Sequence, residues 1–134
     1  MAKVLANNPP QKVRALHIII KHKNSRNKVT RNKQKQEYTN PKMIENRSED
    51  EAEEILLGYL KEINKAKDKK KAFMQMAVKY SDCSSHARGG DLGSFAYKDM
   101  QKAFSDAAFN LDVNEITQSV VVSGSGSHLI MRIE

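Results

Sequence analysis

The residues best able to do chemistry in this chain are its single cysteine and two widely separated histidines. Cys83 stands in the segment SDCSSHARGGDLGSF, with His86 three residues further on and a pair of glycines after it. His17 lies in an apolar run near the start of the chain, and His128 lies in another near its end. A thiol near imidazoles can be a nucleophile with its base, a metal ligand, or one polar wall of a pocket in which no covalent bond forms.

The first two possibilities lack partners elsewhere in the sequence. A cysteine hydrolase needs an oxyanion hole of backbone amides beside the thiol, and no signature of one is recognisable here. Asp82 directly precedes Cys83, and a neighbouring carboxylate disfavours the thiolate. Structural zinc takes four ligands, whereas Cys83 and His86 have no matching second pair. A purely structural interpretation also stands, in which the cysteine and the histidines are satisfied residues of a buried core.

Two segments at opposite ends of the chain predict strands that position the histidines. The run VRALHIIIKH is almost continuously apolar and β-branched, which is typical of a strand buried on both faces. On such a strand His17 shares a face with Ala15 and Ile19. The terminal ITQSVVVSGSGSHLIMRIE has two β-rich runs around a Gly/Ser turn and predicts a hairpin. Pairing of the first strand with this hairpin would bring His17 close to His128.

Three segments between these strands have helical spacing. Ser48 offers an N-cap with Glu51 as its capping-box partner, and a stripe of apolar residues follows. This first stripe consists of Ala52, Ile55, Leu56, Tyr59, Leu60 and Ile63. The second consists of Phe73, Met76, Ala77 and Tyr80, and the third of Met100, Phe104 and Ala107. The segment GGDLGSF predicts a tight turn into a short strand.

The order of these elements predicts one α+β domain, with strands at both ends and helices between them. A chain of 134 residues suffices for one compact domain with a single core. We expect a flexible lead-in at 1–12, a domain at 13–134, and a long basic loop at about 22–47 within that domain.

The basic loop concentrates the positive charge of the chain. Lysine and arginine outnumber aspartate and glutamate by 23 to 16, and the formal net charge of +7 favours an anionic partner. The run KHKNSRNKVTRNKQK, from Lys21 to Lys35, contains no acidic residue. Because the loop has no helical or alternating period, we expect an exposed insertion that is either mobile or used to bind phosphate or nucleic acid. Its one aromatic residue, Tyr38, provides little for nucleic-acid bases to stack on.

The cysteine count and the hydropathy bear on the cellular compartment. One cysteine cannot form an intramolecular disulfide, and no apolar segment approaches the roughly 20 residues that span a bilayer. We therefore expect a protein of the cytoplasm or nucleus with no membrane partner. The sequence contains no tryptophan, so no module that depends on tryptophan is expected in it.

Five ordered segments of this sequence resemble the parvulin family of peptidyl-prolyl cis/trans isomerases. They are HIIIKHKNSR, YSDCSS, GGDLGSF, MQKAFSDAAF and SGSGSHLIMRIE. They are most similar to the eukaryotic branch that acts on phosphoserine-proline and phosphothreonine-proline bonds, without the WW domain that often accompanies it. The likeness runs from Val13 to Glu134 except for the insertion. It implies an FKBP-like fold, a small antiparallel four-stranded sheet surrounded by helices, and no cofactor or metal.

The resemblance also implies which residues form the site. The catalytic cluster beneath the substrate peptide bond would consist of His17, Cys83, Ser125 and His128. The pocket for the proline ring would consist of Leu92, Met100, Gln101 and Phe104.

The resemblance further implies a phosphate site in the basic loop. Lys21 and Arg26 fall on the matching positions, and an arginine fork can bond two phosphate oxygens at once. Asn27 departs from the pattern, because this branch often has a second arginine there, and the loop is longer than usual. The candidates to compensate are Lys23, Lys28 and Arg31.

We therefore expect a monomeric isomerase that acts on proline-containing, phosphorylated protein substrates. The twisted amide can be favoured without covalent attack, and covalent attack by Cys83 is the alternative. A different class of function is a binding-only module, in which the fold recognises proline and the basic loop docks nucleic acid or an acidic protein surface.

Overall fold

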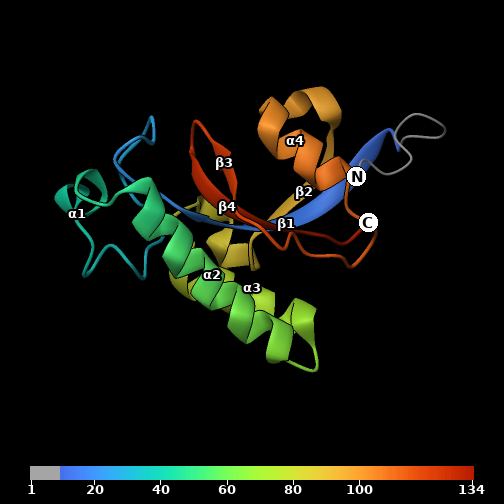
Figure 1. Ribbon diagram of the computed structural model, residues 1–134, viewed down its shortest axis with the longest axis horizontal. Helices are drawn as coiled ribbons and strands as arrows, with labels where there is room; N and C mark the ends of the chain where they lie inside the picture. The colour runs from blue at the N-terminus through green and yellow to red at the C-terminus, as the bar shows by residue number, and fades with distance from the viewer. Residues whose placement is uncertain (1–9) are drawn as a thin grey trace.

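A four-stranded antiparallel sheet is the centre of the fold (Figure 1). The computed structural model describes residues 10–134, so most of the lead-in predicted at 1–12 lies outside the described residues. In pairing order the strands are β2 (Asp91–Ala96), β1 (Lys12–Ile20), β4 (Gly126–Arg132) and β3 (Val121–Ser123). The α+β class, the buried first strand and the closing hairpin predicted from the sequence are confirmed.

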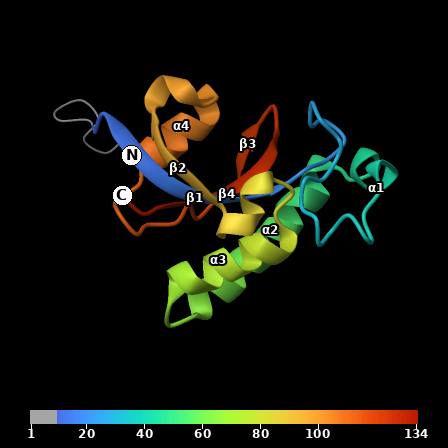
Figure 2. The same cartoon turned by 180° about the vertical axis from the view of Figure 1, so that it is seen from behind.

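Helices cover both faces of this sheet. In chain order they are α1 (Pro41–Glu45), α2 (Glu49–Lys65), α3 (Lys69–Tyr80) and α4 (Lys102–Phe109), with the short 3₁₀ helices η1 (Ser84–Arg88) and η2 (Tyr97–Asp99). Figures 1 and 2 show α2 and α3 on one side of the sheet and α4 on the other. The predicted capping box of α2 is present between Ser48 and Glu51. Met100 was predicted to lie on the third helix, but α4 begins only at Lys102.

The pairing of β1 with β4 places the two histidines on the same face of the sheet. His17 lies opposite Ile130, and Ile19 lies opposite His128. Directly opposed residues of antiparallel strands share a face, and so do residues two apart on one strand. His17 and His128 are therefore diagonal neighbours on the face that α4 partly covers.

Two apolar clusters, one on each face of the sheet, explain why β1 is apolar almost throughout. The face toward α2 and α3 buries Leu16, Ile18, Ile20, Leu56, Leu60, Ile63, Phe73, Leu129 and Met131. The face toward α4 buries Val13, Ala15, Phe95, Phe104, Ala108, Phe109, Leu111 and Ile130. A strand with helices on both faces has no polar side to expose.

The paired glycines before β2 allow the chain to pass close to β1. The amide of His17 donates to the carbonyl of Gly90 at 3.0 Å. Gly90 has φ +86°, and a Cβ there would meet the carbonyl oxygen of His17. Only glycine combines this backbone conformation with such a close approach.

The basic loop between β1 and α2 is exposed over most of its length, as its sequence predicted, but some of its side chains are buried against the domain. Residues 41–45 form α1, and the buried residues of the segment between β1 and α2 are Lys21, His22, Ser25, Thr30, Asn32, Lys35 and Ile44. Asn32 Nδ2, for example, donates to the carbonyls of Val78 and Ser81 at 3.1 and 2.8 Å. Hydrophobic periodicity detects apolar burial, so it misses a segment that is buried through polar bonds to the main chain.

No helix within residues 10–134 combines the length and the apolar character needed to cross a membrane.

The apolar cluster beneath α2 provides a test of the fold. Leu56 is fully buried and its neighbour Leu57 is 41% exposed. Leu56→Ala should lower the free energy of unfolding by about 2–5 kcal/mol, because it removes buried methyl groups and leaves a cavity. Leu57→Ala is the matched control and should change it by about 0.5 kcal/mol or less. Urea unfolding followed by circular dichroism measures both, and equal losses would contradict the assignment of this helix face.

Candidate active site

Two histidines from neighbouring strands stack at the centre of the candidate site. The rings of His17 and His128 have centroids 5.3 Å apart and an interplanar angle of 23°, and their Nδ1 atoms are 3.1 Å apart. One Nδ1 must carry a proton and the other must accept it, so the two rings cannot both be doubly protonated in this arrangement. The approach of the two histidines predicted from the strand pairing is confirmed.

His128 is held in its neutral form. Burial lowers the pKa of this imidazole well below its ordinary value, and the nearby His17 and His22 lower it further. Its Nε2 lies 2.7 Å from Ser123 Oγ. Ser123 was not among the predicted site residues, and the alternating serines before His128 were the only sequence signal for it.

Cys83 lies at the N-cap of η1, where its sulfur accepts a hydrogen bond from the amide of Ser85 at 3.5 Å. Burial raises the pKa of the thiol, but the nearby imidazole of His17 and the hydrogen bond from Ser85 outweigh this effect and lower the pKa to about 6. A thiol with such a pKa is mostly thiolate at neutral pH.

The sequence-based expectation that Asp82 disfavours this thiolate is wrong. The carboxylate of Asp82 is wholly buried and is occupied by other partners. Its Oδ2 accepts from the amide of Lys21 at 2.9 Å, and its Oδ1 lies 2.8 Å from the ammonium of Lys35. The negative charge of Asp82 is thus compensated locally, and adjacency in sequence to Cys83 does not decide the state of the thiol.

An apolar slot, formed by Leu92, Met100 and Phe104, adjoins the imidazoles. The edge of Phe104 meets His17 at a centroid distance of 5.6 Å and His128 at 5.1 Å. Leu92 comes from β2 and Met100 from the segment that leads into α4. Phe104 is buried, while Leu92 and Met100 are partly exposed. The slot therefore offers an apolar surface next to polar groups that are largely withdrawn from water.

The tip of the β3–β4 hairpin is tied to the segment before α4. Gln101 Nε2 donates to Ser125 Oγ at 2.9 Å, and its Oε1 accepts from the amide of Gly124 at 2.8 Å. The amide of Ser125 donates to Ser123 Oγ at 3.1 Å. These bonds fix the hydroxyl groups along one wall of the site.

A basic rim, formed by Lys21, Arg26 and Arg31, borders the same cavity. The guanidinium of Arg26 donates to Ser125 Oγ at 3.3 Å, so the rim continues directly from the hairpin wall. Lys21 Nζ donates to the carbonyl of Val29 at 2.6 Å. Burial lowers the pKa of Lys21, although the charge of Asp82 opposes that shift.

Of the three residues named as candidates to compensate for Asn27, one lines the cavity. Arg31 lines the cavity, whereas Lys23 and Lys28 do not, within the part of the chain that the structure describes. The ammonium of Lys28 instead donates to the carbonyl of Ser25 at 3.1 Å.

One cavity of about 470 Å³ gathers all the residues predicted for the site. This volume suits a short stretch of peptide. The predicted residues that line it are His17, Lys21, Arg26, Cys83, Leu92, Met100, Gln101, Phe104, Ser125 and His128. The residues that line it in addition are Ile19, Asn27, Arg31, Asp99 and Ser123. Strand pairing was visible in the sequence, but the course of the basic loop, which brings Arg31 here, was not.

His86 lies outside this cavity. Its ring is buried, and its Nδ1 is 2.9 Å from the carbonyl oxygen of Val78. Among residues 10–134, no group of three or more histidine, cysteine and carboxylate side chains is placed to hold a metal ion.

Comparison with known proteins places the chain in a family. Residues 17–134 match the family model described as Rotamase, PPIC-type PPIase domain. Peptidyl-prolyl cis-trans isomerase NIMA-interacting 1 of Theileria annulata is 42% identical over 91% of this chain and 80% of its own length. Peptidyl-prolyl cis-trans isomerase Pin1 of Malus domestica is 38% identical over 96% of this chain and 98% of its own length.

Solved structures agree as well. The peptidyl-prolyl isomerase ESS1 from Candida albicans superposes with a TM-score of 0.74 at 33% identity, over 95% of this chain. This chain spans 65% of the length of that protein. The match to a family model over most of the chain and the identity to several isomerases establish its membership. The chain therefore belongs to the PPIC-type, or parvulin, family and is a peptidyl-prolyl cis-trans isomerase.

Proposed function

We propose that this isomerase turns X–Pro bonds without covalent attack and prefers bonds that follow phosphoserine or phosphothreonine. The observation that carries the proposal is that three surfaces belong to one cavity. They are the apolar slot, the basic rim, and a thiol–imidazole wall formed by Cys83, His17 and His128. The slot would receive the proline ring of a substrate, and the thiol–imidazole wall would face the peptide bond before it. The basic rim would receive the side chain of the residue before proline.

The reaction places modest demands on the protein. Resonance gives the amide C–N bond partial double-bond character and a rotational barrier of about 18–20 kcal/mol. At the twisted transition state that resonance is lost, so the nitrogen regains its lone pair and the carbonyl oxygen loses negative charge. Lowering the barrier by about 4 kcal/mol accelerates rotation roughly a thousandfold. Differential binding of the twisted amide is sufficient for an effect of this size.

The cavity residues have the properties needed for such differential binding. Leu92, Met100 and Phe104 would hold the proline ring while the rest of the peptide rotates. A negative thiolate at Cys83 repels a carbonyl oxygen most strongly while that oxygen carries its full ground-state charge. Repulsion that weakens as the bond twists lowers the barrier without a bond to sulfur.

The basic rim has the properties of a phosphate site. The side chains of Arg26 and Arg31 are exposed, and neither forms an ion pair with a carboxylate of any described residue. Two guanidinium groups and the Lys21 ammonium on one edge of a cavity attract a dianion, and each fork can bond two of its oxygens. Arg31 would thus do the work of the arginine that is missing at Asn27.

Substitution of Cys83 separates the electrostatic mechanism from the covalent one. We expect Cys83→Ala and Cys83→Ser to keep measurable isomerase activity, and Cys83→Asp to exceed both because it restores a negative charge. A protease-coupled assay with a phosphorylated Ser-Pro peptide gives kcat/KM for each. Complete loss of activity in all three variants, with circular dichroism unchanged, would favour an obligatory covalent step.

The ionisation of Cys83 is a second test of the site. Cys83 is the only cysteine, so alkylation by iodoacetamide reports on this thiol alone. Because the thiolate is the nucleophile, the alkylation rate should rise with pH and level off above the pKa of about 6. In His17→Gln the inflection should move to higher pH, since the imidazole that lowers the pKa is lost. An ordinary cysteine thiol has a pKa of about 8.5. A wild-type inflection at pH 8 or above would therefore contradict the described environment of Cys83.

Peptides with and without phosphate test the substrate preference. We expect kcat/KM to be higher for the phosphorylated Ser-Pro peptide. Arg31→Ala or Arg26→Ala should reduce this advantage by about tenfold, because each removes one charge-assisted hydrogen bond to the phosphate. Lys33→Ala, an exposed lysine of the same loop, is the matched control and should leave the preference intact. Equal efficiency of wild type on both peptides, at moderate salt, would remove the phosphate proposal.

A further inference from the structure

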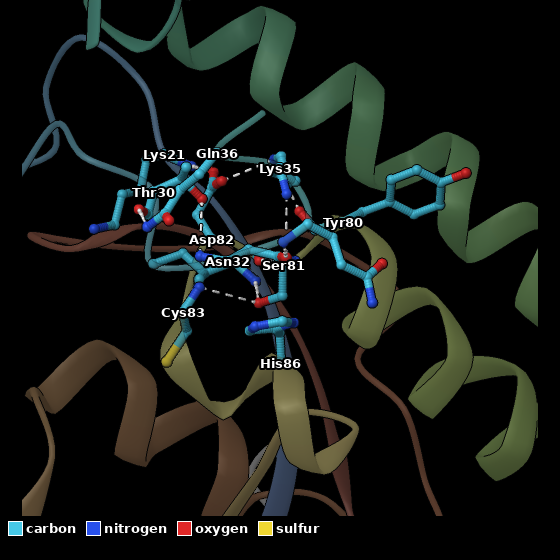
Figure 3. Close-up of polar contacts among 12 residues, drawn as sticks. Lys21, Thr30, Asn32, Lys35, Gln36, Tyr80, Ser81, Asp82, Cys83 and His86 are labelled. Atoms are coloured by element: carbon cyan, nitrogen blue, oxygen red, sulfur yellow. Dashed lines mark hydrogen bonds and ion pairs between the residues drawn. The ribbon is translucent and has the colours of Figure 1, made fainter. Parts of the chain in front are cut away.

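A buried carboxylate joins the basic loop to the residue that precedes the catalytic thiol. Asp82 is wholly buried, and its main chain is bonded on both sides. Its amide donates to the carbonyl of Ile19 at 2.8 Å, and its carbonyl accepts from the amide of Arg31 at 2.8 Å. Its side chain accepts from the amide of Lys21 at 2.9 Å. Asp82 therefore connects the end of β1, the basic loop and Cys83 (Figure 3).

Lys35 supplies the charge that balances this carboxylate. Its ammonium lies 2.8 Å from Asp82 Oδ1 and donates to the carbonyl of Tyr80 at 2.9 Å. Lys35 is 6% exposed, although it lies in a loop whose other lysines and arginines between residues 22 and 34 are mostly exposed. Figure 3 shows the Lys35 ammonium between Tyr80 and the Asp82 carboxylate.

Asn32 makes a second attachment beside the first. Its Nδ2 donates to the carbonyls of Val78 and Ser81, and its Oδ1 accepts from the amide of Gln34 at 2.9 Å. Val78 and Tyr80 lie in the last turn of α3, where carbonyls have no partner within the helix. A cation and an amide donor are the groups that such a helix end favours.

These contacts determine where two functional groups lie. Arg31 stands next to Asn32 and is bonded through its amide to Asp82, so the attachment fixes the point at which the arginine enters the cavity. Cys83 stands next to Asp82 on the other side. A shift of the loop relative to Asp82 would therefore move the basic rim and the thiol relative to each other.

We propose that Asn32, Lys35 and Asp82 form a loop lock, in which Lys35 and Asn32 are positioning residues that set Arg31 and Cys83 relative to the substrate. The part of this inference that concerns Arg31 rests on the proposed phosphate preference. The part that concerns Cys83 does not.

A buried ion pair is a costly way to gain stability alone. Desolvation of the two charges offsets much of their attraction, and an apolar pair of similar size is often as stabilising. This pair, however, also has directed hydrogen bonds to the main chain, from Lys35 to the carbonyl of Tyr80 and from the amide of Lys21 to Asp82, and these define one geometry. That property is what a loop needs when it carries a substrate-binding group on a stretch with few apolar contacts.

The test compares Lys35→Met with Lys35→Arg and with the control Lys33→Met. Lys35→Met removes the charge with an unbranched side chain that is one atom shorter, while Lys35→Arg keeps a cation that can pair with Asp82. We expect Lys35→Met to lower kcat/KM for the phosphorylated Ser-Pro peptide by about tenfold, a loss that displacement of a positioning group by less than ~1 Å can produce. Lys35→Arg and Lys33→Met should stay close to wild type.

Iodoacetamide titration of Cys83 gives a readout that a merely structural role would not move. In Lys35→Met the carboxylate of Asp82 is left unbalanced next to the thiol, so the inflection should move to higher pH. In the double variant Lys35→Met/Asp82→Asn the negative charge next to the thiol is removed as well, and the inflection should return toward that of wild type. Catalytic efficiency on the phosphopeptide should stay low, because the attachment of the loop is still missing.

The outcomes separate this inference from the phosphate proposal. If Lys35→Met is less stable but keeps both its kinetic constants and its thiol inflection, the lock is only structural and the inference is overturned. If wild type shows no preference for the phosphorylated peptide, the phosphate proposal fails. The loop lock is then decided by the effect of Lys35→Met on the thiol inflection and on kcat/KM for the unphosphorylated peptide. If Lys35→Met does not fold, Asn32→Ala and the double variant decide it by the same measurements.

Discussion

The register between β1 and β4 is the constraint on which the site depends. Side chains alternate between the two faces of a sheet, so a slip of one residue would move every side chain of one strand to the other face. In the observed register His17 and His128 share a face and place their Nδ1 atoms 3.1 Å apart. Apolar clusters on both faces of β1 hold this register, because each face has its own set of residues to bury. The chemistry of the site thus rests on the packing of the sheet.

Burial and charge then set the state of each polar group on that face. The same desolvation that keeps His128 neutral would keep the thiol of Cys83 protonated, and the two groups differ because His17 stabilises the thiolate. Asp82 could have reversed this balance through repulsion. Its carboxylate is instead occupied by the main chain of Lys21 and the ammonium of Lys35. The distribution of partners, rather than the order of residues along the chain, decides which group is charged.

The parts of the fold that could be predicted from the sequence are those with a local or periodic signal. The capping box at Ser48, the apolar stripe of α2 and the β-branched run of β1 each predicted an element that is present. Strand pairing then brought the histidines together, and the family resemblance supplied the other predicted cavity residues, whereas Ile19, Asp99 and Ser123 also line the cavity and were not predicted for the site. The basic loop had no such signal, because Asn32 and Lys35 are buried through bonds to main-chain carbonyls of α3 and to Asp82. For the same reason the sequence could not decide between Arg31 and the neighbouring lysines.

This difference in how segments are held suggests a division of roles within one small domain. In the function proposed above, rotation of the prolyl bond takes place between the apolar slot and the Cys83, His17 and His128 side chains, which are held by the sheet, by α4 and by η1. In the same proposal, recognition of the residue before proline falls to the basic loop, which contributes Ile44 and few other apolar side chains to the interior. A loop attached mainly by polar bonds can change length and sequence while the apolar clusters beneath it stay the same. In the proposed loop lock the constrained positions are those that meet Asp82, since there the loop and the segment that contains Cys83 share one set of contacts.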